Sequence, residues 1–303
     1  LYLQPWSGFI TAQSTSNVNP LFKTLWDWME LLLIPFALAG IAFLFRKSEI
    51  ESANRQSREK SRDDALSLYF QHIQTILLET DLSDLQDAGA TSKLTTARTI
   101  SLLRMLDPER KLLVLRFLHD ADLIKGTQPF VNLVRADLSR IVSYRFYLSD
   151  ANLHRANLEY AQLQSAYLDR AYLSGVNLFR ASLSSANINK ANLEYALIDE
   201  ADLYLAQLQE TSLIKATACK SNFAGAFLDN AVLRDVDLTR ANLRKAKLRG
   251  AYLVGAKLVH SNLSNADLTE ANLTEANLMY ANLRGADLTK ANLSNAIVSK
   301  AQL

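Results

Sequence analysis

The amino-acid sequence predicts a mainly β repeat solenoid, preceded by a transmembrane helix and a small α-helical region. Two observations predict this organisation: a five-residue repeat runs without interruption over 131–303, and residues 31–45 form one apolar run. We therefore expect four segments. They are an extracytoplasmic segment at 1–24, a transmembrane helix at 25–47, a helical stalk and cap at 48–124, and the β-solenoid at 125–303.

The composition excludes several classes of function. The formal net charge is only +2 and the pI is about 8.5, whereas nucleic-acid-binding domains usually carry a strongly basic patch. Cys219 is the single cysteine, so an internal disulfide and a multi-cysteine metal site are both excluded. The four histidines lie far apart in sequence and have no metal-ligand spacing. We expect no metal and no nucleic acid.

The apolar segment near the start has the length of a membrane span. Residues 31–45 are fifteen uninterrupted apolar residues, and residues 25–45 together number 21. As a helix, that length crosses a hydrocarbon layer of about 30 Å. Two alternatives are a cleaved signal peptide and a buried core helix. Acidic residues, rather than a basic region, precede the run, so a signal peptide fits poorly.

The flanks of this segment suit a membrane anchor. Aromatic side chains precede the apolar run, where an interfacial belt would lie, and a proline inside it is tolerated in membrane helices. Basic residues follow the run, so the positive-inside rule places the repeat on the cytoplasmic side. The residues that carry these features are Trp26, Trp28, Pro35, Arg46 and Lys47.

Three helices are predicted between this span and the repeat. The first extends to Thr80, and its apolar stripe is Leu66, Tyr69, Ile73, Ile76 and Leu77. After a break at 81–92, the second has the stripe Leu94, Ala97, Ile100, Leu103 and Leu106. The third begins at Asp107-Pro108, with Asp as N-cap and Pro at N1. Its face is Leu112, Leu115 and Leu118, widened by Leu113 and Phe117. We favour a helical cap on the β-structure over a separate docking module.

The repeat has the pattern Ala-(Asn/Asp)-Leu-x-x. Of the 35 residues from Leu133 to Leu303 whose numbers end in 3 or 8, 29 are Leu. A period of five would carry Leu around all sides of an α-helix and onto alternate faces of a strand. A coil that turns a corner every five residues points each Leu inward. Ala218 would leave a void that Phe223 fills, and Phe146 would cover Ser143.

This pattern resembles the pentapeptide-repeat family. The resemblance implies a right-handed quadrilateral β-helix in which four repeats form one coil. Residues 97–124, ARTISLLRMLDPERKLLVLRFLHDADLI, together with the apolar run, also resemble a membrane-anchored subgroup that is abundant in photosynthetic bacteria. That second resemblance implies single-pass localisation in an inner or thylakoid-type membrane, with the repeat domain in the cytoplasm.

No catalytic arrangement appears in the sequence. Asn and Asp recur before Leu at intervals of twenty, but hydrogen bonding between coils explains that ladder without catalysis. There is no phosphate loop, no Ser-His-Asp arrangement and no metal spacing, so we expect no enzyme activity, no cofactor and no small-molecule substrate. The resemblance suggests an alternative, a soluble DNA-mimicking inhibitor or protector of gyrase. Residues 121–303 carry 20 Lys/Arg against 17 Asp/Glu, which disfavours DNA mimicry.

Residues twenty apart should stack in columns on one face of the solenoid. One column interleaves basic and aromatic side chains, a composition that is enriched at protein interfaces. The alternative is a solvated wall with scattered apolar residues. The candidate protein-binding face consists of Arg140, Tyr160, Phe179, Arg180, Lys220, Arg240, His260, Met279, Tyr280 and Lys300.

A second candidate is a basic belt around one coil. No acidic residue occurs from 238 to 266, and the belt would meet an acidic partner or lipid headgroups. Because its side chains point in several directions, a solvated belt is the alternative. Its residues are Arg244, Lys245, Lys247, Arg249 and Lys257.

We therefore expect a non-enzymatic, membrane-anchored scaffold or accessory subunit whose rigid β-helix binds protein partners. The resemblance to proteins of photosynthetic bacteria suggests a larger membrane complex, and a photosynthetic complex is one candidate.

Overall fold

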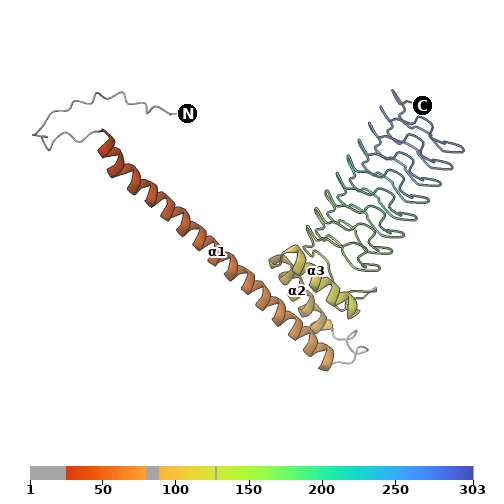
Figure 1. Cartoon of the computed structure of the whole chain (residues 1–303). Coiled ribbons are helices and arrows are strands. Elements are labelled where there is room, and N and C mark those ends of the chain that lie inside the picture. The colour runs from red at the N-terminus through yellow and green to blue at the C-terminus, as the bar shows by residue number, and fades with distance from the viewer. Residues whose placement is uncertain (1–24, 80–88, 127, 303) are drawn as a thin grey trace, which may run out of the picture. The chain divides into compact units, whose positions relative to one another are not determined.

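The computed structural model describes residues 25–79, 89–126 and 128–302, and within the first range the side chains of 39–78. The expected segment at 1–24 lies outside the described residues. The chain divides into two compact units, Leu1–Ser61 and Arg62–Leu303. Three helices precede the repeat: α1 (Leu25–Glu79), α2 (Gly89–Met105) and α3 (Pro108–Asp120) (Figure 1).

The expected single-pass localisation in an inner or thylakoid-type membrane is wrong. Among the helices of the described residues, none has both the length and the apolar character that crossing a bilayer requires. The uninterrupted apolar run is fifteen residues long, which as a helix extends about 22 Å, less than the hydrocarbon layer of ~30 Å.

The residues expected to flank the span are placed in part. α1 continues through Arg46 and Lys47, which are both exposed, as far as Glu79. The side chains of Trp26, Trp28 and Pro35 lie outside the described part of the chain.

The end of α1, from Arg62 onward, packs with α2 and α3 into a small helical cap. The apolar stripe predicted for α1 is confirmed, since Leu66, Tyr69, Ile73 and Ile76 are buried. These side chains belong to the same hydrophobic core as Leu133 and the following inward residues of the repeat.

The buried face of α2 differs from the predicted one, because two threonines take the place of aliphatic residues. Leu94 is exposed, and the buried residues are Thr95, Thr99, Leu102 and Leu103. Thr99 Oγ1 lies 2.8 Å from the Tyr69 hydroxyl and donates a hydrogen bond of 2.8 Å to the Thr95 carbonyl oxygen. Those partners satisfy the Thr99 hydroxyl inside an apolar core, where an unpaired one is costly.

α3 begins where the sequence predicts. Asp107 is the N-cap, its carboxylate accepts the Arg110 backbone N–H at 3.1 Å, and Pro108 occupies the first turn. The predicted face is confirmed at Leu115 and Leu118, which are buried, while Leu112 and Phe117 are partly buried. The buried face also includes a charge. Leu113 is exposed, and the buried residues are Lys111, Val114, Leu115 and Leu118.

After α3 the backbone forms coils of twenty residues. Parallel bridges join each residue whose number ends in 2 or 7 to the residue twenty positions later, from Asp137–Asn157 to Asn282–Gln302. Between them, inward residues also bond across coils, as when Leu138 N–H donates to the Asn157 carbonyl oxygen at 2.8 Å. Four bridging positions per coil give the stack four walls. Figure 1 shows the coils stacked one on another after α3.

A left-handed residue turns each corner. Every residue whose number ends in 0 or 5, from Arg135 to Lys300, has a positive φ, although only five of them are glycine. Where an Asn or Asp precedes the Leu, it supports the turn, because its side chain accepts the backbone N–H two residues later. Asn177 Oδ1 accepts the Phe179 N–H in this way at 3.0 Å.

The interior of the coils is filled by the residues the repeat predicts. From Val131 to Leu283, nearly all residues at the Ala and Leu positions are buried, including Ala218 and Phe223. Phe223 is among the largest fully buried side chains, five residues after Ala218 and therefore in the same coil. A large and a small side chain thus share one layer. Ser143 and Phe146 are also both buried.

One buried ion pair joins the helical cap to the first complete coil. Lys111 of α3 is 4 % exposed, and its Nζ donates to Asp137 Oδ2 at 2.8 Å. Asp137 Oδ1 also accepts the Ser139 backbone N–H at 3.2 Å and the Asn157 side-chain amide at 3.2 Å. Burial favours a raised pKa for Asp137, but the hydrogen bonds from Lys111 and Ser139 outweigh it and lower that pKa.

We predict that Ala218→Leu and Phe223→Leu compensate each other. Ala218→Leu alone overpacks the coil and should reduce the free energy of unfolding by about 1–3 kcal/mol. Phe223→Leu alone leaves a gap and should cost about 1 kcal/mol. The double variant conserves volume and should cost less than the sum of the two. Urea unfolding followed by circular dichroism measures all three, and additive costs would contradict shared packing.

We predict that Asp137→Asn loosens the cap from the coils. The substitution keeps an oxygen for Ser139 but leaves the Lys111 charge buried without its partner, which should cost about 2 kcal/mol. Amide hydrogen exchange along α3 would report this as faster opening. Asp150→Asn, which removes a carboxylate paired with the exposed Arg170, is the control and should cost less than about 0.5 kcal/mol.

The same pair gives the cap a direction of pH dependence. The pKa of Asp137 is lowered below 3.8 in the folded chain. Its carboxylate therefore contributes fully to the stability of the cap at any pH well above 3.8. The contribution is lost as the pH falls through the lowered pKa. If the amide groups of α3 already lose their protection from hydrogen exchange at pH 5, this ion pair does not hold the cap in place.

Candidate functional site

The four walls give each outward side chain a defined place. We number the walls by their bridging residues: wall 1 runs from Asp137 to Ile297, wall 2 from Val142 to Gln302, wall 3 from Tyr147 to Asp287, and wall 4 from Asn152 to Asn292. Each wall also includes the two turn residues that follow a bridging residue by two and three positions. Walls 1 and 3 are therefore on opposite sides.

The structure places the candidate protein-binding face on wall 1, where neighbours in the column contact each other. Arg140 lies over the Tyr160 ring at 5.6 Å, and the Arg180 guanidinium lies 5.9 Å from the same ring. Arg180 Nε donates to Glu200 Oε2 at 2.7 Å, and Lys220 Nζ lies 3.6 Å from Glu200 Oε1. The hydrogen bond from Arg180 lowers the pKa of Glu200. The first half of the column, from Arg140 to Lys220, is a continuous chain of contacts.

The second half of the column, from His260 to Lys300, is another chain of contacts. The rings of His260 and Tyr280 are stacked, with centroids 4.7 Å apart and planes at 9°. Lys300 Nζ donates to the Tyr280 hydroxyl at 3.0 Å and lies 5.1 Å from its ring centroid. Arg240 stands between the two halves.

Phe179 and Met279 border this column on wall 1. The Phe179 ring meets the Tyr160 ring edge-on at 5.9 Å, and Arg180 lies over Phe179 at 5.1 Å. Met279 is half-buried. Wall 1 thus combines aromatic, cationic and aliphatic groups, and most of its cations and rings contact a neighbour in the row.

The basic belt is divided among three walls. Arg244 and Lys245 lie on wall 2, Lys247 and Arg249 on wall 3, and Lys257 on wall 1. Two of the five have acidic partners in a neighbouring coil: Lys257 lies 3.5 Å from Asp237, and Arg249 lies 3.6 Å from Glu270. The belt therefore does not form one continuous basic surface.

The Asn ladder is a structural feature, as the sequence predicts. On wall 2, Asn242 Nδ2 donates to Asn222 Oδ1 at 3.1 Å, and Asn262 and Asn282 continue the series at 3.5 and 3.4 Å. The same oxygens accept backbone N–H groups at the turns, as when Asn242 Oδ1 accepts the Arg244 N–H at 3.2 Å. Each amide joins its own turn to the next coil.

Cys219 is held on wall 1 between two carboxylates. Its backbone N–H donates to Asp199 Oδ1 at 2.7 Å, and its Sγ lies 3.4 Å from Asp237 Oδ1. Burial, followed by the charge of Asp237, raises the pKa of the Cys219 thiol to about 12. A thiol in this state is a poor nucleophile. Within the part of the chain that the structure describes, no group of His, Cys, Asp and Glu could hold a metal ion.

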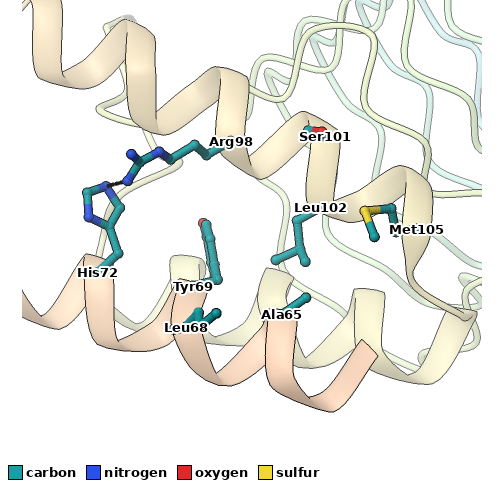
Figure 2. Close-up of a pocket in the computed structure, with 8 residues that line it drawn as sticks. All are labelled: Ala65, Leu68, Tyr69, His72, Arg98, Ser101, Leu102 and Met105. Carbon is teal, nitrogen blue, oxygen red and sulfur yellow. Dashed lines mark hydrogen bonds between the residues drawn. The ribbon is translucent and has the colours of Figure 1, made fainter. Parts of the chain in front are cut away.

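An open pocket of about 330 Å³ lies between α1 and α2 in the cap (Figure 2). Its walls are mainly apolar, and Arg98 contacts His72 at one end, with Arg98 Nη1 2.8 Å from His72 Nε2. Burial and then the Arg98 charge lower the pKa of His72. Sequence analysis missed this pocket because it exists only where the two helices pack.

Comparisons with known proteins agree on the repeat. A model of the family Pentapeptide repeats matches in 8 copies, over 147–184, 177–213, 186–225, 220–253, 246–284 and 271–303. HetL from the cyanobacterium Nostoc sp. strain PCC 7120, a pentapeptide repeat protein involved in heterocyst differentiation regulation, is 31% identical. Its alignment covers 62% of this chain and 94% of HetL, with a TM-score of 0.34.

Two further solved structures are similar. Rfr23 from the cyanobacterium Cyanothece 51142 is 31% identical, over 37% of this chain and 63% of Rfr23, with a TM-score of 0.21. Full-length QnrB1, a plasmid-mediated fluoroquinolone resistance protein, is 18% identical over 51% of this chain and 92% of QnrB1, with a TM-score of 0.28. Among curated protein sequences, no relative matches.

We predict that Cys219 in the folded protein reacts with Ellman's reagent at pH 8 roughly a hundredfold or more slowly than in the unfolded chain. The raised pKa leaves very little thiolate. Asp237→Asn removes one neighbouring charge and should accelerate the reaction. Equal rates for the folded chain and for the chain unfolded in guanidinium chloride would contradict this assignment.

Proposed function

The chain belongs to the pentapeptide-repeat family, and from this premise we propose that it is a non-enzymatic scaffold whose right-handed quadrilateral β-helix binds a protein partner through wall 1. The observation that carries the proposal is the column from Arg140 to Lys300, in which basic and aromatic side chains contact their neighbours in adjacent coils.

The contacts within the column favour binding in two ways. Arg, Tyr and Met are enriched at protein interfaces, and wall 1 presents all three. Ordering a free side chain costs about 0.5–1.5 kcal/mol on association. Arg180 is already oriented by Glu200 and Tyr160, so wall 1 should lose less conformational entropy when a partner docks.

The coil geometry also supports a spacing role. Successive coils are joined by backbone bridges along all four walls, and strands in a ladder lie about 4.8 Å apart. Groups on wall 1 are therefore held at fixed intervals. A partner bound at two positions along the rod would have its own parts held at a set distance.

The charge on wall 1 supports a protein partner rather than imitation of a nucleic acid. In the column of every twentieth residue from Arg140 to Lys300, Glu200 is the single carboxylate, and its oxygens already contact Arg180 and Lys220. The other carboxylates of wall 1 are Asp137, Glu159, Asp199 and Asp237. DNA carries a dense, uniform row of negative charge. Wall 1 instead mixes charges of both signs with aromatic rings.

Site-specific photo-cross-linking in the source cells tests the proposal. A photoreactive phenylalanine analogue would replace Arg180 or Tyr280 on wall 1, with Lys190 or Lys290 on wall 3 as matched controls ten residues later. All four positions are exposed left-handed corners, and the native Tyr280 shows that such a corner accepts an aromatic residue. We expect adducts of one protein from wall 1 only.

A second variant checks that this adduct reflects binding. Tyr160→Ala removes the ring that Arg140, Phe179 and Arg180 contact, so it should reduce the adduct formed from position 280 by about tenfold, as expected for an interface anchor. Equal adducts from walls 1 and 3, or none from either position on wall 1, would refute the proposal.

A further inference from the structure

Acidic and basic residues separate onto different walls in the last part of the described coils. Four acidic residues occur between 238 and 302, namely Asp267, Glu270, Glu275 and Asp287, and all of them lie on walls 3 and 4. Over the same residues, walls 1 and 2 carry the six cations Arg240, Arg244, Lys245, Lys257, Arg284 and Lys300. Walls 1 and 2 meet at the corner formed by Arg240, so these cations lie along the two sides of one edge of the solenoid.

Five of these cations have no ion-pair partner in the described chain. We call Arg240, Arg244, Lys245, Arg284 and Lys300 the basic corner; Lys257 is left out because it pairs with Asp237. Elsewhere on the coils many cations are neutralised by a neighbouring coil, as Arg170 is by Asp150 and Lys190 by Glu210. The members of the basic corner are all exposed, so their charges act on the solvent side.

Amide groups add hydrogen-bond donors to the same surface. Asn242, Asn262 and Asn282 lie on wall 2 beside the basic corner, and each uses one N–H in the ladder. A side-chain amide has two N–H donors, so one remains on each. Carboxylate oxygens accept hydrogen bonds from both amides and cations. Cations, spare donors and the absence of carboxylates from walls 1 and 2 over 238–302 together fit an anionic ligand.

The side chains around the basic corner favour a protein over a single-stranded nucleic acid. Binding of bases usually relies on aromatic rings whose faces are open for stacking. The Tyr280 ring is instead stacked on His260 and contacted by Lys300. Val259, Met279 and Ile297 lie nearby on wall 1, and Ile297 is 47% exposed. Aliphatic groups beside unpaired cations are typical of a protein interface.

We propose that the basic corner binds an acidic segment of a protein partner, with Asp or Glu side chains meeting the cations and apolar side chains meeting Val259, Met279 and Ile297. This inference rests on the proposed function, because it names the chemistry of a partner for the same scaffold. It differs by including wall 2 and the later coils. Since the cations are exposed, the interaction should weaken as salt shortens the Debye length below about 8 Å.

Fluorescence anisotropy with the full chain and labelled decaglutamate tests this inference. The test variant is Arg244→Glu/Lys245→Glu on wall 2. The matched control is Lys247→Glu/Arg249→Glu, which makes the same change of charge in the same coil but on wall 3. We expect the wall 2 variant to bind at least about tenfold more weakly, and the control to stay within about twofold.

Three results would overturn the inference. They are no binding of decaglutamate at low salt, equal losses in the two variants, and tighter binding of a ten-nucleotide thymidylate strand than of decaglutamate. The last result would assign the basic corner to nucleic acid. Circular dichroism melts of both variants separate loss of binding from loss of fold.

The two experiments fail independently. Cross-linking at position 180 probes the first half of wall 1, far along the chain from the basic corner. It does not depend on decaglutamate. If decaglutamate binds as expected but position 180 gives no adduct, the surface of the partner lies at the basic corner and not along wall 1. If cross-linking succeeds and decaglutamate does not bind, the partner's contact is not an acidic segment.

Discussion

A corner at every fifth residue is the constraint on which the rest of this structure depends. Each corner places a residue in the left-handed region, with φ of +58° at Arg135 and +59° at Lys300, which costs about 1–2 kcal/mol without glycine. The cost is offset locally by the Asn or Asp that accepts the turn N–H, and between coils by backbone bonds such as Arg140 N–H to the Glu159 carbonyl oxygen at 2.9 Å. Buried Leu and Ala then fill the interior, so the corner geometry and the core stabilise each other.

The same constraint decides where function can lie. Because the inward positions are committed to packing, only the outward positions of the coils carry charged groups, and each stands next to the residue twenty positions away in the chain. Because of the repeat, residues chosen at intervals of twenty stack in one column on the same wall. Wall 1 carries cations and rings that contact one another, whereas the basic corner carries cations without ion-pair partners. The first arrangement favours a pre-ordered contact surface, and the second favours long-range attraction of an acidic partner.

The helical cap joins this regular structure through irregular contacts. Lys111 reaches Asp137 from α3, the Thr96 hydroxyl accepts the Asn132 backbone N–H at 3.0 Å, and Ser92 donates to the Phe130 carbonyl oxygen at 2.7 Å. These bonds satisfy groups at the start of the solenoid that have no preceding coil. A solenoid needs such a cap because each repeat is stabilised mainly by its neighbours.

The sequence by itself determined the solenoid, its columns and the start of α3, because the neighbours of an inward Leu or an outward Asn lie at a constant interval of twenty residues and a cap is local. The same columns predicted which residues share wall 1. Only the tertiary structure decided that Lys111 is buried, that Thr95 and Thr99 replace Leu94 on the buried face of α2, and that Lys257 and Arg249 are paired while Arg244 and Lys245 are not. It also overturned the membrane localisation, since the described helices contain no segment that spans a bilayer. These features depend on how non-repeating helices pack and on which rotamers exposed side chains adopt, and no fixed interval in the chain encodes either.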